Sequence, residues 1–102
     1  MARRLDLHEK FCDLLGTRNV YFQPPESVKL KYDCITYKTS NRNDLIADDT
    51  RYRGYTAYEV TFITRDPDSL MPEEIMNSFT YIVHNSTYVA DNLHHDVFTI
   101  YY

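Results

Sequence analysis

Residues 55–65 (YTAYEVTFITR) alternate between apolar and polar side chains, and this alternation commits the chain to forming a sheet. Tyr58, Val60 and Phe62 fall on one face of an extended strand, while the polar residues between them fall on the other. One apolar face and one polar face are typical of a strand in an antiparallel sheet that covers a core on one side.

Residues 28–38 (VKLKYDCITYK) predict a partner for this strand. The segment alternates at first and becomes apolar on both faces from Cys34 to Tyr37, as a central strand does. A shorter strand is predicted over 20–22, because the prolines at 24 and 25 cannot donate hydrogen bonds to a sheet. We therefore expect a long hairpin made of 28–38 and 55–65.

Helical spacing appears twice in the chain. Residues 3–15 place an apolar stripe on one face, and Gly16 follows as a residue suited to the left-handed end of a helix. The stripe consists of Leu7, Phe11, Leu14 and Leu15. A second helix is predicted over 72–81, with Pro72 as its first residue. Two last strands, 86–90 and 96–102, are expected around the turn Asp91-Asn92.

These elements predict one α+β domain that spans residues 1–102. The expected sheet is largely antiparallel and has four or five strands, because strands that are neighbours in sequence are joined directly. The two helices are expected to pack on one face of it. A length of 102 residues is that of a single domain with little free energy to spare for a deep cavity.

The residues that carry chemistry do not form a recognisable catalytic or metal pattern. His94, His95 and Asp96 are adjacent, but neighbours on a strand point to opposite faces and cannot converge on one ion. Cys12 and Cys34 lie in predicted core patterns and are interpreted as buried thiols of a reducing compartment. We therefore predict no enzyme, no cofactor and no bound metal.

Charge and hydropathy narrow the range of partners. The formal net charge is −4, whereas domains that bind nucleic acid usually carry a basic patch, so the charge does not indicate a nucleic-acid-binding protein. We expect no signal peptide, because no apolar run precedes Asp6, and no stretch approaches the ~20 apolar residues that span a membrane. No membrane partner is predicted.

Residues 39–53 (TSNRNDLIADDTRYR) form the longest stretch without periodicity, and a loop of this length is usually functional. Leu45 and Ile46 are an apolar pair amid charges of both signs, a composition that suits contact with a neighbouring subunit. An EF-hand is not indicated, because the loop lacks the spacing of one. The candidate residues for contact with another subunit or a tail tube are Arg42, Asp44, Leu45, Ile46, Asp48, Asp49, Arg51 and Arg53.

Three stretches together resemble a known family. They are LGTRNVYFQPPESVKLKYDCITY after the first helix, RYRGYTAYEVTFITRDPDS in the middle and YVADNLHHDVFTIYY at the end. They resemble small proteins encoded among the morphogenesis genes of long-tailed bacteriophages, similar to the tail-terminator or tail-completion proteins. The resemblance covers nearly the whole chain, and its motifs are structural and not catalytic.

The resemblance implies a structural protein of the virion, located at the head–tail junction and assembled in the cytoplasm of the host bacterium. Such subunits form a ring, typically of six, that caps the tail tube and docks to the head-closure or connector protein. DNA passes through the channel without sequence-specific binding. The implied partners are other copies of the chain, the tail tube protein and the connector.

Alternative functions stay open at this point. Within the same class, the chain is a different connector ring subunit, namely a head-closure or adaptor protein. A second class is a small monomeric enzyme with His94 or His95 in a pocket. A third is a nucleic-acid-binding regulator that uses Arg3 and Arg4.

Overall fold

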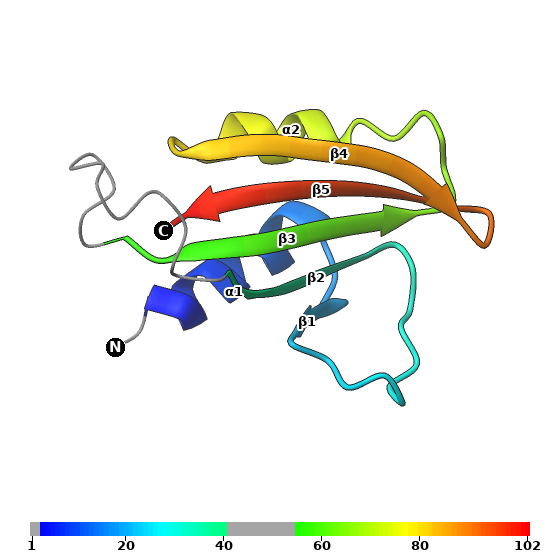
Figure 1. Cartoon of the computed structure of the whole chain (residues 1–102), viewed down its shortest axis with the longest axis horizontal. Coiled ribbons are helices and arrows are strands. Elements are labelled where there is room, and N and C mark those ends of the chain that lie inside the picture. The colour runs from blue at the N-terminus through cyan, green and yellow to red at the C-terminus, as the bar shows by residue number, and fades with distance from the viewer. Residues whose placement is uncertain (1–2, 41–54) are drawn as a thin grey trace.

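The computed structural model describes residues 3–40 and 55–102 of the chain, and within them it has two helices and five strands. The helices and strands follow one another as α1 (Arg3–Leu15), β1 (Val20–Phe22), β2 (Cys34–Thr39), β3 (Ala57–Thr64), α2 (Met71–Ser78), β4 (Ile82–Ala90) and β5 (Leu93–Tyr101). The predicted α+β class is confirmed, with both helices on one side of the sheet (Figure 1).

The five strands form one mixed sheet in the order β1-β2-β3-β5-β4. β2 and β3 make the predicted antiparallel pair, with Tyr37 opposite Val60. β5 lies between β3 and β4 and is antiparallel to both. The one parallel pair joins β1 to β2, because the chain leaves β1 and returns through residues 23–33 before it enters β2. The strands β1 and β4 are therefore the two edges.

The helix α1 has the predicted bounds and buries the predicted stripe. Leu7 and Phe11 are fully buried, and Leu14 and Leu15 pack against the same core. Gly16 ends the helix with a φ of +79°, and its N–H donates to the carbonyl of Cys12 at 2.8 Å. A left-handed residue directly after the last turn satisfies a carbonyl that would otherwise lack a partner.

Tyr37 of β2 is the centre of the contact between α1 and the sheet. Its ring meets the Phe11 ring at 5.3 Å between centroids, and its hydroxyl lies 2.8 Å from Nδ1 of His8. Arg4 donates to the same hydroxyl at 3.4 Å, so the hydroxyl in turn donates to a neutral His8. Burial lowers the pKa of His8 and raises the pKa of Tyr37, which favours this neutral arrangement.

Four of the predicted bounds are wrong, and one of them is the start of the strand expected over 96–102, which is β5 and begins at Leu93. The strand expected over 28–38 begins only at Cys34, because β3 ends at Thr64 and offers residues 28–32 no partner. The second helix ends at Ser78 and not at 81, since Phe79 is already extended with φ −127° and ψ 143°. The strand expected over 86–90 starts earlier, at Ile82, where it pairs with Ile100 of β5.

The last hairpin turns at the predicted residues. Asp91 and Asn92 have φ values of 54° and 65°. Two successive left-handed residues make a turn whose twist matches that of the flanking strands, and Asp and Asn tolerate this conformation better than most residues.

Candidate interaction surface

The edge strand β4 is exposed along most of its length. Eight of its nine residues are exposed, and only Ile82 at its start is partly buried. Val83, Tyr88 and Val89 are 50%, 48% and 60% exposed. β5, its neighbour, is partly or fully buried along its whole length. The strand β4 therefore carries apolar and aromatic residues that favour strands, and the described part of the chain leaves them exposed to solvent.

β4 also lacks the usual protection of an edge. Natural edge strands discourage pairing by being short, by carrying charge or proline, or by a bulge. None of the nine residues of β4 (IVHNSTYVA) is Asp, Glu, Lys, Arg or Pro, although the register shifts by one residue between His84 and Ser86. Beyond this bulge, Ser86–Ala90 forms an unbroken run of five residues paired to β5.

The opposite edge of the sheet, formed by β1, is short and is followed by prolines. β1 is only three residues long, and Gln23 directly after it has a φ of 45°. Pro24 and Pro25 follow and cannot donate backbone hydrogen bonds. Strand addition at β1 is therefore limited by its length and by these prolines, whereas the β4 edge is long and open.

A small polar network lies on the helix-facing side of the β4–β5 pair. Thr87 donates to Oδ1 of Asp96 at 2.7 Å, and Nε2 of His84 lies 3.1 Å from the same oxygen and 3.0 Å from the Thr87 hydroxyl. Both contacts of His84 use one ring nitrogen, whereas a nucleophile–histidine–carboxylate relay needs one partner on each nitrogen. The geometry ties β4 to β5 and does not resemble that relay.

His94 and His95 point to opposite faces, as the sequence predicts. His94 lies opposite Thr64 in the register, and His95 stacks on Tyr88 with ring centroids 4.6 Å apart and planes 8° from parallel. Both histidines are half-buried. In the part of the chain that the structure describes, no group of three His, Cys, Asp or Glu could hold a metal ion.

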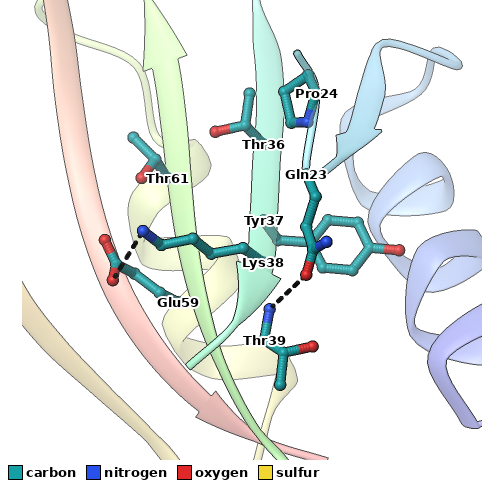
Figure 2. A pocket seen from close by; sticks show the side chains of 8 residues that line it. All are labelled: Gln23, Pro24, Thr36, Tyr37, Lys38, Thr39, Glu59 and Thr61. Atoms are coloured by element: carbon teal, nitrogen blue, oxygen red, sulfur yellow. Dashed lines mark hydrogen bonds and ion pairs between the residues drawn. The ribbon is translucent and has the colours of Figure 1, made fainter. Parts of the chain in front are cut away.

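A shallow groove lies on the face of the sheet that the helices leave open (Figure 2), with a volume of about 490 Å³. Thr36, Lys38, Glu59 and Thr61 line it from β2 and β3, and Lys38 reaches Glu59 at 4.0 Å. Gln23 closes one side and accepts a hydrogen bond from the N–H of Thr39 at 3.4 Å, while the Tyr37 ring points away toward α1. The lining residues include no His or Cys, and the ammonium of Lys38 lies beside the carboxylate of Glu59.

Both cysteines are buried, free thiols, as the sequence predicts. Burial raises the pKa of Cys12, and it raises that of Cys34 to about 12. A thiol whose pKa is raised stays protonated near neutral pH and is a poor nucleophile.

The predicted contact residues of the long loop are Arg42, Asp44, Leu45, Ile46, Asp48, Asp49, Arg51 and Arg53, and all of them lie outside the described residues. Sequence reasoning missed β4 as an exposed surface. The signal that could have revealed it is the run of nine residues, 82–90, with no charge and no proline.

Comparison with protein-family models, with curated proteins and with solved structures found no match to this chain. Within residues 3–40 and 55–102, neither helix has the length and apolar character needed to cross a membrane.

Proposed function

We propose that this chain is a structural assembly subunit, and specifically a tail-terminator-like component of the head–tail junction of a long-tailed bacteriophage. Copies of it form a ring, of about six by the family resemblance, that caps the tail tube and docks to the head connector. The observation that carries the proposal is the β4 strand, which is exposed at eight of nine positions and contains no Asp, Glu, Lys or Arg. A strand of this kind is a template for pairing with another chain.

The two edges of the sheet favour ring formation over a symmetric pair. One edge is long and open, and the other is short and followed by two prolines. Two unlike surfaces on one subunit suit a head-to-tail contact, which closes into a ring or continues as a filament. The runner-up, another connector ring such as a head-closure or adaptor protein, is supported by the same surfaces.

Charge is compatible with a channel for DNA. Residues 66–102 contain six acidic residues and no Lys or Arg. An acidic wall repels phosphate and lets DNA slide without binding, whereas a basic wall would hold it. In this proposal the chain acts through contacts and not through catalysis, and it needs no cofactor.

The long loop has a place in the proposal on sequence grounds alone. Leu45 and Ile46 are proposed as apolar anchors in a contact with the next subunit or the tail tube, and the arginines and aspartates around them are proposed to pair across it. Deleting residues 43–49 is expected to leave the subunit folded while ring assembly and the joining of tails to heads are lost. If the deleted protein still assembles and joins tails, the loop has no such role.

Molar mass in solution tests the proposal as a whole. Light scattering of the purified chain, alone and with the tail tube protein, is expected to show a ring or an oligomer that depends on the tube, and electron microscopy should show an annulus. A chain that stays monomeric at all concentrations and does not bind the tube protein would refute the assembly function and return attention to the enzyme and regulator alternatives.

A further inference from the structure

Residues 28–32 (VKLKY) have the alternation of a strand but lie in no strand of the described chain. The reason is in the register. Cys34 pairs with Ile63, so residue 33 is the last to lie beside β3, where Thr64 donates to Oδ1 of Asp33 at 2.8 Å. β3 ends there, and the turn that begins at Asp66 leads the chain away. The segment 28–32 therefore runs past the end of β3.

Three of the five side chains of this segment are exposed, and those of Leu30 and Tyr32 are half-buried. Val28 is 39% exposed, and both Lys29 and Lys31 are exposed. Apolar residues at 28, 30 and 32 would share one face of an extended strand, with the two lysines on the other. The segment has the composition of a strand and a positive charge, but it lacks a strand to pair with.

The β4 edge has the complementary properties. Its run Ser86–Ala90 matches the segment 28–32 in length at five residues each. Exposed acidic residues lie in the turn before α2, in the first turn of α2, which contacts β4, and in the turn after β4. They are Asp66, Asp68, Glu73, Glu74 and Asp91. Figure 1 shows that α2 runs along β4, which it contacts. The β1–β2 connection lies near the opposite edge of the sheet.

We propose that residues 28–32 of one copy add as a sixth strand to the β4 edge of the next copy. Backbone hydrogen bonds would join the two sheets, and Lys29 and Lys31 would meet the acidic residues around β4. The inference rests on the proposed function, because it requires self-association, and it names the two surfaces that meet. The segment 28–32 and β4 lie near opposite edges of the sheet. Each copy can therefore contact one neighbour at each edge, and the contact repeats from copy to copy.

The main competitor is a symmetric pairing of β4 with β4 of a second copy. Charge gives it no advantage, because a second β4 brings no Lys or Arg to meet Glu73, Glu74 and Asp91. A basic strand at the same edge supplies the opposite charge. The segment 28–32 is therefore the occupant that the charges favour.

Engineered disulfides separate these two arrangements. If the five-residue runs align end to end, their central residues, Leu30 and Tyr88, face each other whichever way the added strand runs. Cβ atoms of directly opposed residues lie about 5 Å apart, close to the reach of a disulfide. We expect the double variant Leu30→Cys with Tyr88→Cys to form a ladder of linked dimers, trimers and larger species on oxidation.

The single variants and the unaltered chain are the controls. The unaltered chain should stay unlinked, because Cys12 and Cys34 are buried. An equal mixture of the two single variants should link into dimers only. Dimers formed by Tyr88→Cys alone would show β4–β4 pairing and overturn the proposal, as would a double variant that forms no ladder.

Exchange of charge tests the same contact without a covalent bond. Lys29→Glu with Lys31→Glu makes both surfaces acidic, and Glu73→Lys with Glu74→Lys puts lysines at two of the acidic positions that Lys29 and Lys31 are proposed to meet. Each variant alone should associate at least about tenfold more weakly, and mixing the two should restore association, because each then meets its opposite. Asp6→Lys with Asp13→Lys is the matched control on the exposed side of α1, and circular dichroism verifies that every variant is folded.

The outcomes distinguish this contact from the proposed function. Rings that form normally in both charge variants, with no ladder from the cysteine pair, overturn the contact and leave the assembly function standing. A chain that is monomeric and gives no ladder overturns both.

Discussion

The change Phe11→Ala tests the packing of α1 on the sheet. The Phe11 side chain is fully buried, with its ring 5.3 Å from that of Tyr37 and 5.7 Å from that of Phe79 between centroids. Truncating a buried Phe costs about 3–5 kcal/mol through lost burial and the cavity left behind. The two edge-on or tilted ring contacts place the expected loss in the upper half of that range.

A loss of about 4 kcal/mol is a large fraction of the ~5–10 kcal/mol that holds together a domain of this size. The midpoint of thermal unfolding, followed by circular dichroism, should fall by about 15–30 °C. Phe11→Leu refills most of the space and should cost only about 1–1.5 kcal/mol, so it keeps the test readable if the alanine variant does not fold.

Leu5→Ala is the matched control on the same helix. Leu5 is 56% exposed, and its truncation should change the free energy of unfolding by less than ~0.5 kcal/mol. If Phe11→Ala melts within a few degrees of the unaltered chain, α1 does not form part of the core. The packing of α1 on the sheet through Phe11 would then be refuted.

Three smaller predictions concern single contacts. Because burial lowers the pKa of His8, the unfolded chain binds more protons below about pH 6.5, so stability should fall as the pH drops below that value; His8→Gln should reduce this loss in urea titrations at pH 7.5 and pH 5. Arg18→Ala should raise the lowered pKa of Glu9 toward its ordinary value in NMR titrations, with little change in the unfolding midpoint, because Arg18 holds that carboxylate with two bonds of 2.9 Å in an exposed pair. Asn92→Gly should raise the free energy of unfolding by about 0.5 kcal/mol, since its φ of 65° favours glycine; an unchanged or lower urea midpoint would argue against strain at this turn.

The sequence pattern correctly predicts helices and strands that depend on interactions between residues close together in the chain. The helix Arg3–Leu15 has the predicted bounds because its apolar period and Gly16 both act within a few residues. The β3 face of Tyr58, Val60 and Phe62 is buried as predicted, since alternation alone decides which side chains point to the core.

The errors occur where a distant part of the chain decides the outcome. Ile82 falls at helical spacing with Ile75 and Phe79, but it belongs to β4 because β5 pairs with it. Short apolar segments satisfy both periods, so the pattern alone does not separate helix from strand there. The position of β4 at the edge of the sheet is likewise a property of the strand order, which no local window of sequence contains.

At residues 28–32 and at β4, the local sequence disagrees with the environment that the structure gives it. The two disagreements are complementary, and this argues for one shared cause. One segment has a strand's sequence and no strand, and the other has a strand's structure and exposed apolar residues along an unpaired edge. In a chain that functions alone, local preference and final environment usually agree, and conflicts between them concentrate at functional sites. A contact between these two surfaces of neighbouring copies would give the first segment its partner and the second its cover, so one interaction resolves both conflicts. Two independent causes would be needed if the chain worked as a monomer.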